Sequence, residues 1–130
     1  MKQLLPILLA CVLTSTVVMA DGVLSLAGSE WGLGSDDKNG VMVKFEPEGK
    51  VWGRLGCNRF TGTYKQDGLS LSFGPLATTR MACDEEKMKT EQKLSEVLNA
   101  TQQADITHLK LTLQDASGKE LVVLQRRDFD

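Results

Sequence analysis

Short segments of alternating apolar and polar residues, separated by X-Gly pairs, recur along most of the chain. Asn39-Gly40, Asp67-Gly68 and Ser117-Gly118 are such pairs, and Glu46-Pro47-Glu48-Gly49 is a longer turn signal. Glycine accepts the positive φ of tight hairpin turns, so this spacing is typical of strands that pair with their nearest neighbours. The pattern predicts a mainly β (α+β) protein: a single antiparallel, barrel-like sheet of about seven or eight strands.

One segment departs from this pattern. The residues from Asp84 to about Asn99 include neither Gly nor Pro, and they begin with three acidic side chains, which a helix dipole favours in the first turn. Four apolar residues can form a stripe along such a helix: Met88, Leu94, Val97 and Leu98. We therefore expect one amphipathic helix that lies against the curved sheet or closes it.

The N-terminus has the pattern of a secretory signal. Lys2 precedes an apolar run from Leu4 to Val18, and small or apolar residues then lead up to Ala20. We expect residues 1–20 to be cleaved after Ala20, which leaves 21–130 as a single domain in the periplasm.

Lipidation is the alternative for this leader. Leu8-Leu9-Ala10-Cys11 resembles a lipobox, in which Cys11 would be acylated and would anchor an envelope lipoprotein. An uncleaved membrane anchor is a third interpretation, and all three export the chain from the cytoplasm. After residue 22 no run of about 18 uncharged residues occurs, so no integral membrane segment is predicted in the mature chain.

Composition excludes several classes of partner. The chain has 130 residues and a net charge of −2, and it has no basic cluster of the kind that binds nucleic acid. Its apolar fraction of 42% argues against intrinsic disorder. Trp31 and Trp52 are interpreted as core residues, and the tail Arg126–Asp130 is expected to fray.

Two longer segments carry a family resemblance. They are Gly56–Tyr64, which contains Gly-Cys-Asn-Arg, and Phe73–Cys83, which contains Thr-Arg-Met-Ala-Cys. With Trp31-Gly32-Leu33 before them and the segments Leu109–Leu113 and Leu121–Leu124 after them, they resemble the META domain, the family that includes HslJ-like proteins. The resemblance implies an antiparallel barrel with one helix, an envelope location, a link to stress response and no established catalytic activity.

The cysteines allow three interpretations. If Cys11 is removed with the leader, Cys57 and Cys83 remain, an even count in an oxidising compartment. A disulfide between them would stabilise the fold by roughly 3 kcal/mol. Buried free thiols are the second interpretation, and a redox or metal site is the third. No Cys-x-x-Cys spacing occurs and His108 is the only histidine, so no metal or cofactor is predicted.

The other candidate site residues are Asn58, Arg59, Gly62, Thr79 and Arg80. In a structural interpretation Asn58 adopts left-handed geometry in a turn, while the two arginines pair with carboxylates or cap carbonyls. In a functional interpretation Asn58, Arg59, Thr79 and Arg80 form a rim that faces a ligand. The sequence leaves both interpretations open.

No catalytic set is evident. His108 lies on the polar side of the expected strand through Leu109, Leu111 and Leu113, and no serine occupies a nucleophile elbow. We therefore expect a non-catalytic envelope protein that binds an unidentified envelope protein in stress response. A small-ligand or lipid binder that uses the barrel interior is the alternative. A thiol redox protein, which would need an exposed free cysteine, is third.

Overall fold

The computed structural model describes residue 3 and residues 23–34 and 37–128. The predicted signal, its cleavage site at Ala20 and Cys11 lie outside the described residues. Within them the chain forms strands β1 (Glu30–Gly32), β2 (Met42–Phe45), β3 (Lys50–Arg54), β4 (Arg59–Asp67), β5 (Ser70–Phe73) and β6 (Ala77–Thr78), helix α1 (Glu85–Ala100), and strands β7 (Gln103–Ile106), β8 (Lys110–Gln114) and β9 (Glu120–Arg126).

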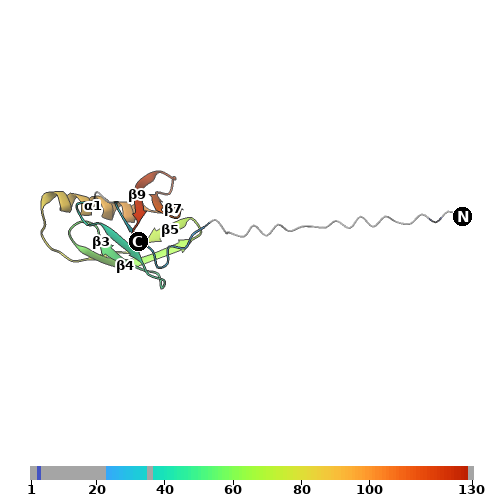
Figure 1. Ribbon diagram of the computed structural model, residues 1–130, viewed down its shortest axis with the longest axis horizontal. Helices are drawn as coiled ribbons and strands as arrows, with labels where there is room; N and C mark the ends of the chain where they lie inside the picture. Colours follow the sequence, from blue (N-terminus) through green and yellow to red (C-terminus); the bar gives the residue numbers. More distant parts are fainter. Residues whose placement is uncertain (1–2, 4–22, 35–36, 129–130) are drawn as a thin grey trace.

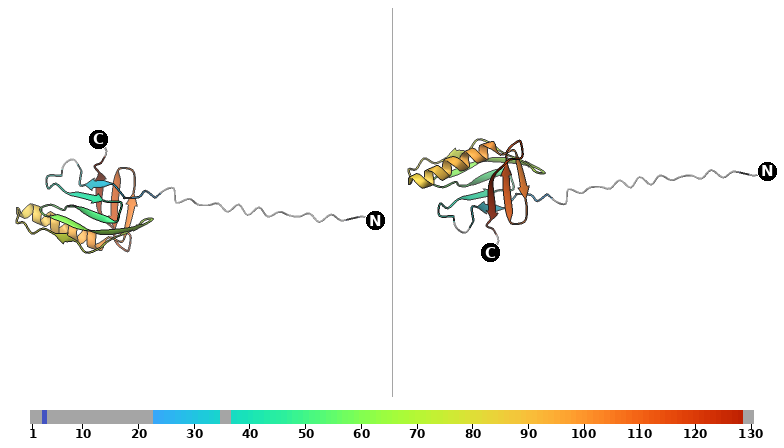
Figure 2. Two further views of the ribbon diagram at one scale, coloured as in Figure 1. Left: turned by 90° about the horizontal axis from the view of Figure 1, so that it is seen from below. Right: turned by 90° about the horizontal axis from the view of Figure 1, so that it is seen from above.

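The strands form one closed antiparallel barrel (Figures 1 and 2). Their order is β3-β2-β1-β9-β8-β7-β5-β4, and β4 pairs again with β3, which closes the ring. The long strand β4 makes this possible, because its first half pairs with β3 and its second half pairs with β5. The two-residue strand β6 lies on β4 outside the ring. The prediction of a barrel-like sheet of seven or eight strands is confirmed.

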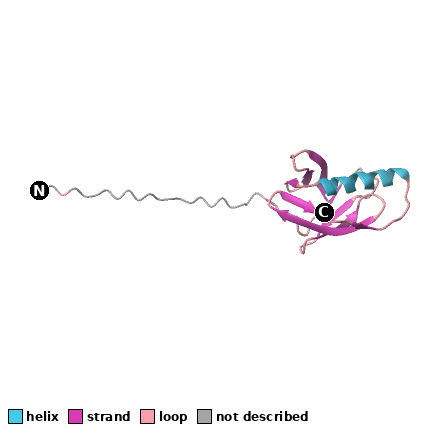
Figure 3. Ribbon diagram, turned by 180° about the vertical axis from the view of Figure 1, so that it is seen from behind, coloured by secondary structure: helices cyan, strands magenta, loops and turns pink. Residues whose placement is uncertain are grey.

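Helix α1 runs along one side of the barrel (Figure 3). Asp84 is its N-cap, and the Asp84 carboxylate accepts a hydrogen bond of 2.9 Å from the backbone N–H of Lys87. Leu94, Val97 and Leu98 are buried against the sheet. The prediction of this helix is confirmed, but Met88 does not belong to the apolar stripe, because it lies on the first turn and is 38% exposed.

Side chains of the chain itself fill the barrel interior. Alternate residues of most strands point inward, and the largest buried side chains include Trp31, Phe45, Phe60, Leu71, Leu111, Leu113 and Leu124. The polar atom of Trp31 has a hydrogen-bond partner there, since its indole N–H donates to the hydroxyl of Ser29 over 2.7 Å. The prediction that Trp52 is also a core residue is wrong. Strand alternation places Trp52 on the outer face of β3, where it is 40% exposed.

A turn interrupts the predicted strand from Leu109 to Leu113. The backbone N–H of Thr107 donates to the carbonyl of Lys110 over 2.9 Å, and the Thr107 hydroxyl accepts from the N–H of Lys110 over 3.1 Å. Both His108 and Leu109 therefore lie in an exposed turn between β7 and β8, and Leu109 is 56% exposed. A threonine closes this turn without glycine, which is why no X-Gly signal marks it in the sequence.

Candidate functional site

A disulfide joins the two motif segments. Cys57, in the loop between β3 and β4, is bonded to Cys83, which lies just before α1. Their Cα atoms are 5.8 Å apart, and 26 positions separate them in the sequence. This bond agrees with the structural interpretation among the three alternatives, and it fits an oxidising compartment.

The Asn58 side chain connects the same two segments by hydrogen bonds. Asn58 is only 4% exposed. Its amide oxygen accepts from the hydroxyl of Thr79 over 3.0 Å and from the backbone N–H of Met81 over 2.6 Å. Its amide nitrogen donates to the carboxylate of Glu91 on α1 over 2.9 Å. Every part of this buried amide is thus paired, as burial of a polar group requires.

Glu91 ties the loop to the helix a second time. One carboxylate oxygen accepts from the Asn58 amide, and the other accepts from the Asn58 backbone N–H over 2.5 Å. Gly56 permits this close approach, because a Cβ on Gly56 would lie 2.6 Å from the carbonyl oxygen of Lys87. We refer to Cys57, Asn58, Thr79, Met81, Cys83 and Glu91 as the disulfide cluster.

Asn58 does not have the left-handed backbone that the structural interpretation expected. Among the described residues only glycines have positive φ. The physical reason is that the Asn58 side chain bonds to Thr79, Met81 and Glu91, which lie far away in the sequence, rather than to its own turn.

The other motif residues lie at the edge of this network or outside it. Thr79 links it to β4, since the Arg59 N–H donates to the Thr79 hydroxyl over 3.1 Å and the Thr79 N–H donates to the Arg59 carbonyl over 3.0 Å. The Arg59 and Arg80 side chains are exposed, and neither forms an ion pair within residues 23–34 and 37–128. Gly62 leaves space for a neighbouring segment, because a Cβ there would lie 2.7 Å from Leu76.

The motif is therefore divided between the inside and the outside of the fold. Asn58 faces inward, whereas Arg59 and Arg80 face solvent, so the four residues of the hypothetical rim do not share one surface. What the cluster can do chemically is hold three segments together: the β3–β4 loop, the β6–α1 segment and α1 itself.

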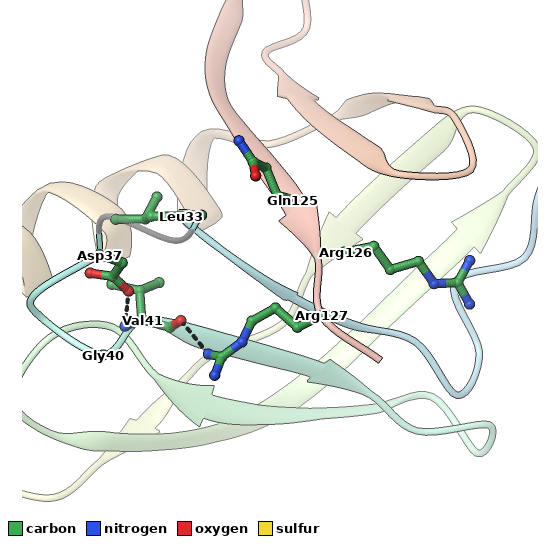
Figure 4. A pocket seen from close by; sticks show the side chains of 8 residues that line it. Leu33, Asp37, Gly40, Val41, Gln125, Arg126 and Arg127 are labelled. Carbon is green, nitrogen blue, oxygen red and sulfur yellow. Dashed lines mark hydrogen bonds between the residues drawn. The ribbon is translucent and has the colours of Figure 1, made fainter. Parts of the chain in front are cut away.

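A surface hollow of about 510 Å³ lies beside the C-terminal end of β9 (Figure 4). The Arg127 guanidinium donates to the carbonyl oxygen of Val41 over 3.0 Å, and the Asp37 carboxylate accepts from the Val41 N–H over 2.6 Å. One Asp37 oxygen and one Arg127 nitrogen are thus already engaged with the backbone.

The C-terminal tail is ordered through Asp128, contrary to the expectation of fraying from Arg126. Arg126 belongs to β9, and the N–H of Arg127 donates to the carbonyl of Glu30 over 2.8 Å. The Arg126 guanidinium donates to the Asp128 carboxylate over 2.7 Å and lowers the pKa of that carboxyl. These contacts place Arg127 on the barrel wall, which sequence reasoning missed because the residue sits in a polar terminal run.

Among the described residues, no group of three or more His, Cys, Asp or Glu side chains is placed to hold a metal ion. In residues 23–34 and 37–128, no helix has the length and apolar character needed to cross a membrane.

The fold and the cluster define a class of protein: a small antiparallel barrel with one helix, in which a disulfide joins the β3–β4 loop to the segment before the helix. Residues 24–128 match the META domain, and the chain belongs to the META domain family.

One curated relative is the heat shock protein HslJ of Escherichia coli strain K12. It is 34% identical to this chain over 96 residues, which are 73% of this chain and 66% of HslJ. The chain thus spans slightly less than two thirds of that relative.

Solved structures have the same fold. A protein from Burkholderia xenovorans, solved by NMR, superposes with a TM-score of 0.65 at 23% identity, over 80% of this chain and 85% of that one. A second protein solved by NMR gives a TM-score of 0.59 at 26% identity, over 85% of this chain and 94% of that one.

Proposed function

We propose that this protein is a non-catalytic, exported envelope protein that acts by binding another protein during stress. The observation that carries the proposal is membership of the META domain family together with the similarity to a heat shock protein. The disulfide supports export, because such bonds persist in oxidising compartments.

The packing of the barrel supports action through the outer surface. Trp31, Phe45 and Phe60 are among the side chains that occupy the interior, and each is at most 1% exposed. A small barrel filled in this way offers little room for a ligand inside. Binding of a small molecule or lipid in the interior is therefore the weaker alternative, and a redox role is weaker still while Cys57 and Cys83 are bonded.

Capture of partners from the periplasm tests the binding role. The full chain, tagged at its C-terminus, is expressed in its host, cross-linked before and after heat shock, and purified from the envelope fraction. We expect a specific protein to be enriched after heat shock. Repeated capture of no protein under several stresses would count against the proposal.

A matched control separates specific capture from adhesion of unfolded chain. The double variant Cys57→Ser, Cys83→Ser is expressed at the same level, and proteins that it captures equally well are set aside.

The intact mass of the exported protein tests the location. We expect a chain that starts at Asp21 and gains no alkyl group when it is alkylated without reduction. A lipid-modified start at Cys11 would instead establish a tethered lipoprotein, and a chain that retains residues 1–20 in the cytoplasm would overturn export.

A further inference from the structure

A shallow groove of about 590 Å³ lies on the outer face of the barrel, across β1 to β4. It is distinct from the disulfide cluster, and its wall includes Trp52, Arg54, Arg59 and Arg127. Strand register explains how these residues meet. Arg54 on β3 lies directly opposite Arg59 on β4, and Met42 on β2 lies on the other side of Arg54.

The pairing of Arg54 with Arg59 is electrostatically unfavourable. Like charges directly opposite each other on neighbouring strands destabilise a sheet. No carboxylate relieves this pair, since neither guanidinium group forms an ion pair or a hydrogen bond within the described residues. Two arginines with unused guanidinium donors therefore lie on neighbouring strands in the wall of the groove.

A third arginine is held in place beside them. Arg127 crosses β1 and donates to the Val41 carbonyl, as Figure 4 shows. Gly32 permits this crossing, because a Cβ on Gly32 would lie 2.6 Å from Cδ of Arg127. One nitrogen of the Arg127 guanidinium is thus anchored, and its charge stays at the groove.

The groove carries a charge opposite to that of the protein. Three arginines and one carboxylate, that of Glu30, line it, whereas the whole chain has a net charge of −2. Two positive charges are left without a counterpart, which matches the charge of a phosphate monoester near neutral pH. Guanidinium groups recognise such oxyanions by paired, charge-assisted hydrogen bonds.

An apolar wall completes the groove. Trp52 is 40% exposed, and its indole N–H donates to the Glu46 carboxylate over 2.9 Å, which fixes the orientation of the ring. Met42 lies beside it in the lining. A ligand with an anionic head and an apolar body can therefore place the head on the arginines and the body on Trp52.

We propose that the groove formed by Arg54, Arg59, Arg127 and Trp52 binds a phosphate monoester group, either on a soluble metabolite or on a lipid headgroup. This site goes beyond the proposed binding of a protein partner, and it stands or falls independently of it.

Two probes distinguish the sources. The folded, disulfide-bonded protein is titrated with glycerol 1-phosphate while the indole N–H signal of Trp52 is followed by NMR. It is also sedimented with phosphatidylcholine vesicles that contain phosphatidic acid. We expect at least one probe to bind: glycerol 1-phosphate alone indicates a soluble ligand, whereas the vesicles alone indicate a lipid headgroup.

A double variant links the binding to the groove. Arg54→Gln with Arg59→Gln is expected to weaken binding at least tenfold, because two charge-assisted contacts are lost. The same variant should melt no lower than the parent, because an unfavourable like-charge pair has been removed. The matched control is Lys93→Gln with Lys119→Gln, which makes the same change in net charge at exposed positions outside the groove.

Two results would overturn the proposal. The first is no binding of either probe; a glutamate-rich peptide that binds in that case would assign the groove to an acidic protein segment instead. The second is an equal loss of binding in the control variant, which would show an effect of overall charge.

Discussion

The disulfide cluster and the β7–β9 meander are stabilised in opposite ways. The cluster joins segments that are far apart in the sequence by one covalent bond and the hydrogen bonds of one buried amide. The meander joins neighbouring strands by a regular backbone ladder and short turns. Stability in the cluster is therefore concentrated in a few groups, whereas in the meander it is spread over many. Single substitutions should lower the free energy of unfolding strongly in the disulfide cluster and only slightly in the turns of the meander.

Removal of the disulfide should have the largest effect. Cys57→Ala and Cys83→Ala should each lower the free energy of unfolding by roughly 3 kcal/mol, because the unfolded chain regains the entropy of an open loop. Urea denaturation at neutral pH measures this. Reduction of the parent protein should cause the same loss, and a clear difference between the two variants would contradict a purely structural bond.

Loss of the Asn58 amide should come next. Asn58→Ala leaves the Glu91 carboxylate and the Met81 N–H without the buried amide that they contact. We expect the free energy of unfolding to fall by about 2 kcal/mol. The control Asn99→Ala changes an exposed asparagine on α1, the helix that carries Glu91, and should have almost no effect.

A double-mutant cycle sharpens this prediction. Asn58→Ala and Glu91→Ala should couple by about 0.5–3 kcal/mol, because the two side chains share one network. Strict additivity of the two losses would show that Asn58 acts without Glu91.

In the meander, a change of backbone freedom should have a smaller effect. Gly118 has a φ of 85°, and a Cβ there would meet no atom within 4 Å, so Gly118→Ala tests the backbone alone. We expect a loss of about 1 kcal/mol, the cost of left-handed geometry for a residue with a side chain. Gly118→Asn should recover most of it, and a loss as large as that of Asn58→Ala would erase the contrast between the regions.

The same turn provides the smallest effect, and it depends on pH. Hydrogen bonds from the Ser117 hydroxyl and from backbone N–H groups lower the pKa of Asp115 below its ordinary value of 3.8. A carboxyl whose pKa is lowered by folding contributes stability above its unfolded pKa and loses it as the pH falls through the folded value. Asp115→Asn should therefore lower the melting temperature at neutral pH, by less than Gly118→Ala does.

The pH series provides the control for this substitution. The difference between Asp115→Asn and the parent should shrink as the pH falls through the folded pKa of Asp115 and the parent carboxyl also becomes neutral. A difference that stays constant over the whole pH series would assign the effect to packing rather than to charge.

The contrast between the regions also explains what the sequence could predict. Ser117-Gly118 and the helix that follows Asp84 depend on local geometry, so their residues alone indicate them. The turn at Thr107 was missed because it depends on a side-chain hydrogen bond rather than on glycine. The contact of Asn58 with Glu91 joins residues 33 positions apart, and no local pattern marks it.

The outer groove shows the same limit. Arg54 and Arg59 meet only because of the register of β3 on β4, and Arg127 joins them only because β9 pairs with β1. Trp52 was assigned to the core because of its residue type, whereas its place in the alternation of β3 puts it outside. Family resemblance predicted the barrel, but it indicated neither the register nor the groove.

The last strand closes the barrel. β9 pairs with both β1 and β8, so the ring stays open until residues 120–126 join the fold. Until then the edge of β1 is unpaired, and a free strand edge is a template for pairing with other chains. A chain truncated before residue 120 would keep that edge and should aggregate more readily than the parent.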